Sequence, residues 1–130
     1  MCGKIRYEIS EPLVGAGYCH CTRCQRRTGS AASASARIVP GSLRVTEGER
    51  LLKSWQPDDG NPKVFCSECG SHMWSQDRNN PDMLFVRLGS FDTDPGVRPT
   101  DHQYVDYAAA WESIPDDGLP RHPERRPVAP

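Results

Sequence analysis

The sequence predicts a small, mainly β domain, and three observations favour that fold class. Hydrophobic residues make up 36% of the 130 residues, which is enough for one modest core but not for two. The 12 prolines and 11 glycines interrupt the chain so often that long helices have little room. Between these breaks, short segments alternate between apolar and polar residues, as half-buried strands do. Many short strands with frequent turns are typical of small β domains.

The first expected strand shows this alternation clearly. Over residues 4–10, Ile5, Tyr7 and Ile9 fall on one face and charged residues fall on the other. Other segments with apolar or alternating character lie at residues 42–56 (two strands), 63–76, 83–91 and 102–111 (strand or extended).

Two segments leave room for alternatives. The small residues of 30–39 fit a helix or a strand, and only the alanine-rich pieces of the chain suit short helices. Among the strands, residues 83–91 are expected to be the most buried. We expect a single domain over residues 1–120 and a flexible tail over 121–130, which is rich in proline and charge.

Charge and hydropathy exclude some classes of function. The net charge of −1, from 16 basic and 17 acidic residues, argues against a nucleic-acid surface built on bulk charge. No segment approaches the roughly 20 apolar residues of a membrane span, and the first residues lack the apolar run of a secretory signal. We therefore expect a cytoplasmic protein, in which cysteine clusters bind metal more often than they form disulfides.

The six cysteines fall into three groups. Cys2 stands alone, a C-x-C-x-x-C cluster follows in the segment YCHCTRCQRRTG, and a C-x-x-C pair precedes Gly70. The cluster consists of Cys19, Cys21 and Cys24, and the pair consists of Cys66 and Cys69. A disulfide inside the cluster would close a small, strained ring, and inert buried thiols explain only one or two cysteines. We therefore interpret the cysteines as zinc ligands.

Six thiols do not divide evenly between one closed and one open zinc site. A structural zinc takes four protein ligands, whereas a catalytic zinc keeps three and one open position. The cluster at residues 19–24 can supply three ligands from one loop, which suits an open site. Cys66 and Cys69 then need further partners, and Cys2 is the remaining thiol.

Several motifs together resemble one known family. CGKIRYE, CHCTRCQRRTGSA, FCSECGSHMW, LGSFD and DHQYVDYAAAW occur in the order typical of the GFA family, the glutathione-dependent formaldehyde-activating enzymes. The resemblance covers about residues 2–120. It implies a mainly β zinc domain of stacked short antiparallel sheets, in the fold group of Rab-accessory zinc proteins and methionine-R-sulfoxide reductases.

The resemblance also implies two zinc sites. A labile zinc at the active site would be held by Cys19, Cys21 and Cys24, and a structural zinc by Cys66, Cys69 and an N-terminal C-x-C. Cys2 matches the second half of that motif, and its first cysteine would stand one position before Met1. We expect that cysteine upstream in the natural chain. His72, water or the Met1 amine are the alternative fourth ligands.

Three cysteinates suit thiol chemistry better than hydrolysis. With zinc they carry a formal charge of −1, so a bound water ionises less easily, whereas a coordinated thiol is deprotonated. Because the thiolate is the nucleophile, we hypothesise that a small thiol such as glutathione adds to formaldehyde or a related aldehyde. The product with glutathione is S-hydroxymethylglutathione, and the reverse reaction is a carbon–sulfur lyase step. The expected partners are this thiol and aldehyde, without nucleic acid or membrane.

Basic residues near the cluster are candidates for binding the thiol. Arg23, Arg26 and Arg27 can clamp a carboxylate, although a solvated basic loop fits them equally well. His102 matches a family position and is a candidate for positioning substrate or donating a proton, with structural hydrogen bonding as the alternative. His20, between two ligands, is expected to point away from the metal.

Two other readings compete with the enzyme. A non-catalytic, zinc-stabilised binding or scaffold module would keep both zinc ions as structural elements. A redox enzyme resembling the methionine sulfoxide reductases needs a free nucleophilic cysteine, which conflicts with the use of all six thiols as ligands.

Overall fold

The structure is a computed structural model and describes residues 1–127. Its strands are β1 (Arg6–Ile9), β2 (Gly15–Cys19), β3 (Ser33–Arg37), β4 (Leu43–Glu47), β5 (Leu52–Trp55), β6 (Lys63–Cys66), β7 (His72–Gln76), β8 (Leu84–Arg87), β9 (Pro99–Gln103) and β10 (Arg121–His122). Its helical elements are α1 (Thr22–Thr28) and the 3₁₀ turns η1 (Glu49–Leu51), η2 (Leu88–Ser90) and η3 (Val105–Tyr107). The predicted mainly β fold class is confirmed.

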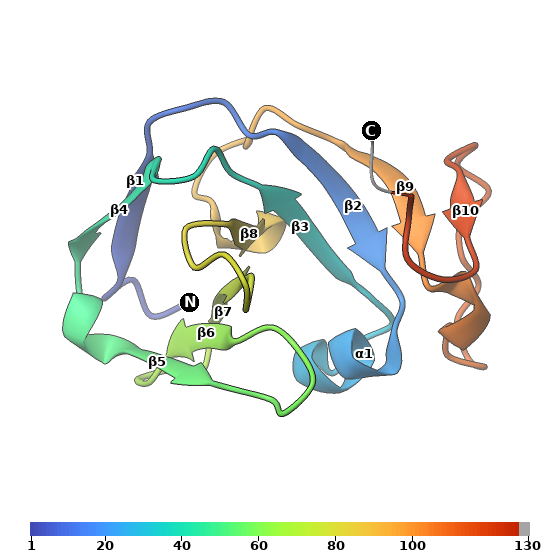
Figure 1. The fold of residues 1–130 in the computed structure, drawn as a ribbon, viewed down its shortest axis with the longest axis horizontal. Helices are drawn as coiled ribbons and strands as arrows, with labels where there is room; N and C mark the ends of the chain where they lie inside the picture. The colour runs from blue at the N-terminus through green and yellow to red at the C-terminus, as the bar shows by residue number, and fades with distance from the viewer. Residues whose placement is uncertain (128–130) are drawn as a thin grey trace.

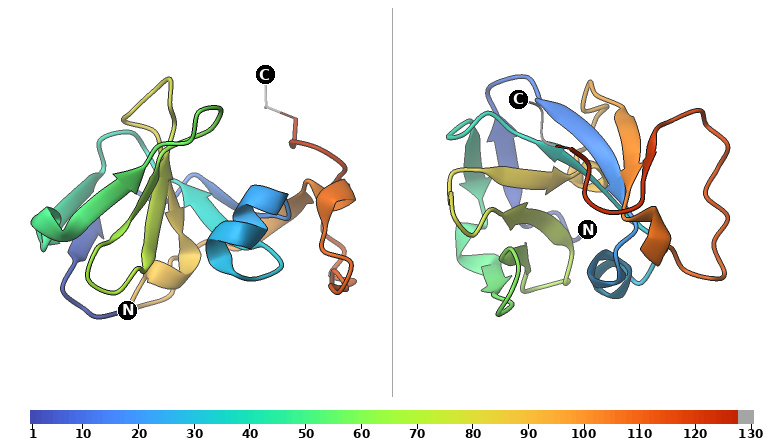
Figure 2. Two further views of the ribbon diagram at one scale, coloured as in Figure 1. Left: turned by 90° about the horizontal axis from the view of Figure 1, so that it is seen from below. Right: turned by 45° about the vertical axis from the view of Figure 1, so that its right-hand side comes forward.

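The strands form two sheets (Figure 1). β1 and β4 make an antiparallel pair, and the other eight strands follow the order β10-β9-β2-β3-β8-β7-β6-β5. Pairing within the large sheet is antiparallel except around β9, which runs parallel to both β2 and β10. Figure 2 shows α1 lying beside the large sheet, near the ends of β2 and β3. The segment that carries the first cysteine cluster therefore follows a central strand.

The core lies between the two sheets and along the middle of the larger one. Its buried members are Ala16, Ala36, Ile38, Val64, Met73, Trp74 and Val86. Tyr7 of β1 packs its ring edge-on against Trp74 and Phe91, with centroids 5.9 and 5.8 Å away. These aromatic contacts attach the two-stranded sheet to the core.

The alternation in the first strand is confirmed. Tyr7 and Ile9 are half-buried, whereas Arg6 and Glu8 are exposed. The two strands predicted within residues 42–56 also form, but they do not pair with each other. β4 pairs with β1 and β5 pairs with β6, because a 3₁₀ turn redirects the chain between them.

The strand predicted to be most buried is not the most buried one. β7, rather than β8, has three consecutive buried residues, Met73, Trp74 and Ser75. In β8, Val86 is fully buried and its neighbours are half-buried. Because β7 lies between β6 and β8 and is covered on both faces, its polar Ser75 is buried together with the apolar residues.

The helix forms where hydrophobic periodicity does not predict one. The alanine-rich residues 30–39 contain β3 instead of a helix, and α1 follows the first cysteines. Cys21 caps the N-terminus, because its sulfur accepts a hydrogen bond from the Cys24 amide at 3.3 Å. Gly29 ends the helix in the left-handed conformation. Local capping therefore defines this helix.

Part of the segment expected to be a flexible tail lies against the sheet. Arg121 and His122 form β10 beside β9, and the amide of Tyr104 donates to the carbonyl of Glu124 at 2.9 Å. Arg126 Nη1 lies 3.2 Å from Asp101 Oδ1, close enough for an ion pair although the angles do not form a hydrogen bond. Residues 128–130 lie outside the described part of the chain, and the domain boundary at residue 120 stays a prediction.

No helix among residues 1–127 combines the length and the hydropathy that crossing a membrane requires.

Candidate metal centres

The cysteines gather into two groups of three. Cys19, Cys21 and Cys24 form the first triad, and Cys2, Cys66 and Cys69 form the second triad. Within each triad the sulfur atoms lie within 4.8 Å of one another, and all six thiols are free. Each triad is therefore able to hold a metal ion, and the structure brings together the two sets that the sequence predicts.

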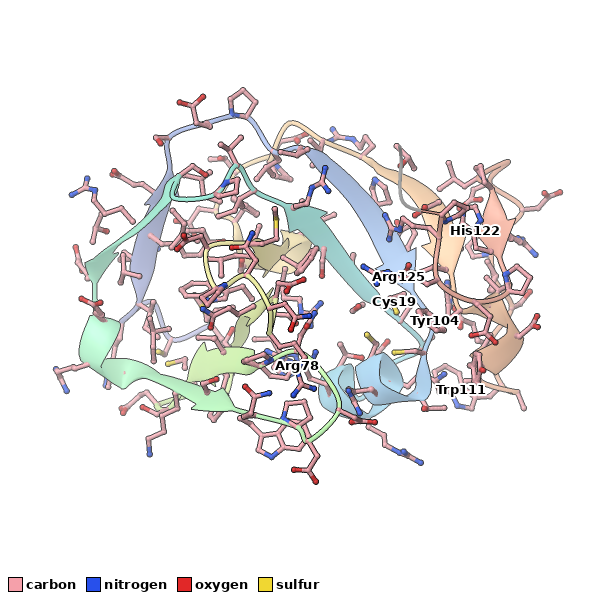
Figure 3. All side chains as sticks on the ribbon, in the orientation of Figure 1. Cys19, Arg78, Tyr104, Trp111, His122 and Arg125 are labelled. Atoms are coloured by element: carbon pink, nitrogen blue, oxygen red, sulfur yellow. The ribbon has the colours of Figure 1, made fainter. Side chains whose placement is uncertain are left out.

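The first triad lies where β2 ends and α1 begins. Cys19 is the last residue of β2 (Figure 3), Cys21 is the helix cap and Cys24 is in the first turn. Cys19 is paired across the sheet with Ser33 of β3 and with Gln103 of β9. The sheet and the helix therefore position the three sulfurs.

Two thiols of the first triad have pKa values shifted in opposite directions. Hydrogen bonds from the side chains of Cys19, Cys21 and Ser33, together with the nearby charge of Arg87, lower the pKa of Cys24 to about 2. The pKa of Cys19 is raised, first because it shares these hydrogen bonds with Cys21 and Cys24 and also because it is buried. A thiolate is the form that binds metal, so a lowered pKa at Cys24 favours metal binding by this triad.

Arg87, at the end of β8, is a neighbour of the triad that the sequence analysis missed. Its guanidinium donates hydrogen bonds to the hydroxyls of Ser35 on β3 and Ser75 on β7, the latter at 3.0 Å. The charges of the first-triad thiols oppose the effect of burial, which lowers the pKa of Arg87. The sequence held only a weak signal, because an arginine ending an apolar strand is usually solvent-exposed.

The three arginines predicted to bind a carboxylate have different surroundings. Arg23 forms an ion pair with Asp59 at 2.6 Å, and Arg26 is exposed. Arg27 turns toward the sheet and donates to the carbonyl of Val64 at 3.0 Å. Its Nη1 atom is buried and has no hydrogen-bond partner among residues 1–127. Of the three, Arg27 has the most buried guanidinium, and its role in binding stays a prediction.

His20 and His102 form a buried pair beside the first triad. His20 Nε2 lies 2.9 Å from His102 Nδ1, and each ring is about 2% exposed. Glu112 binds the other nitrogen of His20 at 3.1 Å, and Asp117 binds that of His102 at 2.9 Å. His102 also stacks on Tyr18, with ring centroids 4.9 Å apart. All four ring nitrogens thus have hydrogen-bond partners. For His102, these are the structural hydrogen bonds that the sequence analysis gave as the alternative to a role with substrate.

We expect His102→Ala to destabilise the fold. The substitution leaves His20 Nε2 buried without a partner and opens a cavity beneath Tyr18. Together these effects cost about 2–4 kcal/mol of unfolding free energy, which urea denaturation measures. Asp117→Asn, which keeps a hydrogen-bond acceptor at a more exposed position, should cost much less. Equal losses for the two variants would contradict this account.

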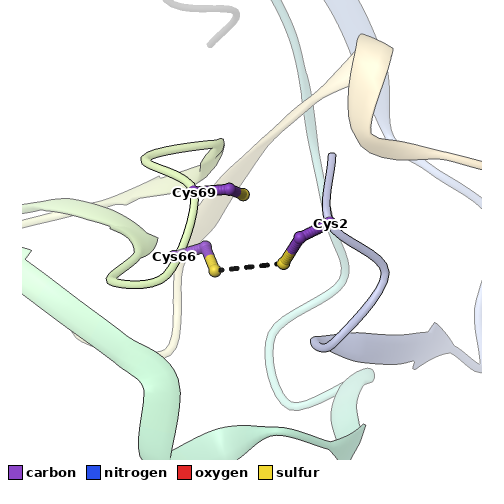
Figure 4. A group of neighbouring side chains, drawn as sticks. All are labelled: Cys2, Cys66 and Cys69. Carbon is purple, nitrogen blue, oxygen red and sulfur yellow. Dashed lines mark hydrogen bonds between the residues drawn. The ribbon is translucent and has the colours of Figure 1, made fainter.

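The second triad joins the N-terminus to the turn between β6 and β7 (Figure 4). Cys2 Sγ and Cys66 Sγ are 3.8 Å apart, and Cys66 is buried. Hydrogen bonds from the backbone amides of Ser71 and Cys2 lower the pKa of Cys69 to about 6. The Gly70 amide donates to the Cys66 carbonyl at 2.8 Å, which closes the turn. The backbone therefore points amides at the Cys69 sulfur.

His72 is not among the residues that the structure gathers at the second triad. It lines a hollow with Arg87, and burial is the first cause of its lowered pKa. The Met1 amine lies 3.4 Å from the Ser71 hydroxyl, beside the triad. The identity of a fourth ligand, including an upstream cysteine, stays a prediction.

We expect Gly70→Ala to weaken the turn that carries the second triad. Gly70 has φ +78°, and a Cβ there would meet nothing within 4 Å. The cost therefore comes from the left-handed backbone alone, about 1–2 kcal/mol. Thermal unfolding of the metal-loaded protein measures it. Gly15→Ala is the matched control, because it also has open space but an ordinary φ, and it should change stability little. An unchanged Tm for Gly70→Ala would contradict the prediction.

Fold and site define a class: a small, mainly β protein with two three-cysteine groups able to hold metal. The family model described as glutathione-dependent formaldehyde-activating enzyme (GFA) matches residues 1–107, and the chain belongs to this family. Both triads, Arg87 and the two buried histidines fall inside the matched region.

Comparison with solved structures also gives a match. The chain is similar to a Rhodobacter sphaeroides protein whose crystal structure was solved in structural genomics. The two are 26% identical with a TM-score of 0.57, and the match covers 92% of this chain and 94% of that one. A search of curated proteins gave no match.

Proposed function

We propose that the protein is a zinc-dependent carbon–sulfur lyase of the S-(hydroxymethyl)glutathione synthase type, which joins a small thiol to formaldehyde or a related aldehyde. The observation that carries this proposal is the first triad. Its three sulfurs come from one short segment, lie within 4.8 Å of one another and have a cationic neighbour, Arg87. Membership in the GFA family supports the choice of glutathione-like thiol and aldehyde as substrates.

The sulfur spacing fits zinc. Zinc–sulfur bonds of about 2.3 Å in a tetrahedron place two sulfurs about 3.8 Å apart, and Cys2 and Cys66 have this separation. We assign the second triad to a structural zinc, because it ties the N-terminus to a turn 64 residues away. We assign Cys19, Cys21 and Cys24 to a second, labile zinc with one open position for the thiol.

The proposed reaction is an addition. The thiol loses its proton, a sulfur–carbon bond forms, the carbonyl π bond breaks, and the oxygen takes up a proton. Zinc held by three cysteinates would supply the deprotonation of the incoming thiol. The side chains of the protein position the sulfur atoms and the group that donates the proton.

We assign Tyr104 as the residue that donates the proton to the carbonyl oxygen of the aldehyde. It follows Gln103, which pairs with Cys19 across the sheet, so its backbone lies beside the first triad (Figure 3). Burial first, and then the nearby Cys19, raise its pKa, against the opposing charge of Arg125, and a neutral phenol is a proton donor. Its φ of 58° is unusual for a residue other than glycine, and such strain is often found at functional sites.

Exchange NMR with ¹³C-formaldehyde and glutathione tests the proposed reaction. The metal-loaded protein should accelerate interconversion of free and thiol-bound formaldehyde above the spontaneous rate, and the metal-free protein should not. A rate equal to the background for the loaded protein would refute the enzyme.

Metal counting separates the enzyme from the non-catalytic scaffold. The enzyme reading expects a mild chelator to remove the ion held by the first triad and to leave the one held by the second. Two ions that resist the chelator equally would favour the scaffold.

A further inference from the structure

A hollow of about 240 Å³ opens beside the first triad, between β3, the turn before β7 and the end of β8. Ser33 and Arg87 are among its lining residues. Ser33 connects it to the triad, because Ser33 lines the hollow and lies directly across from Cys19 in the pairing of β2 with β3. A ligand whose sulfur is at the triad can therefore extend past Ser33 into the hollow.

The surroundings of the hollow are cationic. Arg87 lines it directly, and burial together with the repulsion from Arg87 lowers the pKa of both Arg27 and Lys63. Lys63 and Arg87 share the hydroxyl of Ser75, at 3.5 and 3.0 Å. Among residues 1–127, no carboxylate forms an ion pair with these three cations. Partly buried cations without a counter-charge are costly.

The first triad alone does not balance these charges. Three cysteinates and a divalent ion would carry −1, whereas Arg27, Lys63 and Arg87 are three basic side chains near one another. Two buried guanidinium atoms, Arg27 Nη1 and Arg87 Nε, also have no hydrogen-bond partner within the described chain. The missing elements are therefore negative charge and acceptor oxygens, and a carboxylate supplies both.

We propose that this hollow is the binding site for a carboxylate of the thiol substrate, with Arg87 as its anchor and with Arg27 and Lys63 supplying further positive charge. The inference rests on the proposed function, because it places the sulfur of the same molecule at the first triad. It selects thiols that carry a carboxylate, such as a cysteine-containing peptide, over neutral thiols. The exposed Arg26 and the paired Arg23 are not needed for it.

S-methylglutathione tests the site without thiol chemistry, because its sulfur is blocked. Titration calorimetry of the zinc-loaded protein should detect binding of S-methylglutathione, and replacing its glycine carboxylate by a carboxamide should weaken it about tenfold or more. This comparison uses the unmodified protein and therefore does not depend on whether a variant folds. Equal affinity for the acid and the amide would overturn the assignment of the hollow to that carboxylate.

Arg87→Met then tests the anchor. We expect it to weaken binding of the acid about tenfold or more and to leave binding of the amide nearly unchanged. Arg44→Met is the matched control, because Arg44 is exposed on the other sheet, and its titration should resemble that of the unmodified protein. If Arg87→Met has full zinc content and an intact unfolding transition but weakens binding of the acid and of the amide equally, Arg87 is not the anchor of the carboxylate.

The two proposals fail in different ways. If the protein accelerates the addition of 2-mercaptoethanol to formaldehyde but does not bind S-methylglutathione, the carboxylate site is refuted and the enzyme stands. If it binds S-methylglutathione through Arg87 but accelerates no thiol addition, the carboxylate site stands and the enzyme is refuted.

Discussion

Replacing Cys24 by serine is expected to reduce thiol–aldehyde exchange to the spontaneous rate. Cys24 has the lowered pKa of the first triad, and its sulfur lies within 4.8 Å of the other two, as a shared metal ligand requires. Serine does not ionise near neutral pH, and the loss of this ligand should weaken metal binding at the triad by more than about 100-fold. Exchange NMR gives the rate, and metal analysis should show one ion fewer per chain.

The fold should survive this substitution. The triad is held by the end of β2 and by α1, which form their own hydrogen bonds. Thr22→Ala, at an exposed position in the same helix, is the control for effects on α1 and should retain metal and activity. A Cys24→Ser protein with its full metal content and full exchange rate would contradict the assignment of the first triad.

Cys66→Ser should affect stability much more than Cys24→Ser. Cys66 is 2% exposed, ends β6 and shares the second triad with Cys2 near the chain start. Losing the metal there frees the N-terminal segment and leaves a serine hydroxyl buried among sulfurs. We expect a loss of more than about 4 kcal/mol and a fall in Tm of roughly 10 °C or more, measured by scanning calorimetry.

A chelator strong enough to empty both sites provides the control for this prediction. Treated wild-type protein should unfold at a temperature close to that of Cys66→Ser, because both lack the ion of the second triad, which is the one expected to stabilise the fold. If Cys66→Ser keeps two bound ions and an unchanged Tm, the second triad does not stabilise the fold.

The sequence was sufficient for features that depend on local pattern. The cysteine spacings led to the first triad and to the pair Cys66 and Cys69, because C-x-C-x-x-C and C-x-x-C each constrain their sulfurs within a few residues, whereas Cys2 was added as the remaining thiol and from the family resemblance. The alternation around Tyr7 correctly oriented β1, because only one of its faces meets the core. GFA membership was likewise predicted from the motifs and is confirmed over residues 1–107.

Features that depend on tertiary packing were missed. In the sequence, Arg87 looks like an ordinary residue at the end of a strand. Only the pairing of β8 with β3 and β7 brings its guanidinium to Ser35 and Ser75. α1 has no buried residue and hence no apolar stripe, so its cysteine cap and Gly29 were the signals to read. The partners of His20 lie 82 and 92 residues away, and no local pattern connects them.

The ion pair between Arg126 and Asp101 bears on where the protein can be shortened. Asp101 is a buried carboxylate, and both its ion-pair partner Arg126 and its neighbour His122, whose Nε2 lies 3.6 Å away, come after residue 120. A recombinant version trimmed there would keep this carboxylate inside the sheet and discard Arg126, its cationic partner. Expression of the protein for crystallisation is therefore better designed to run at least through Arg126.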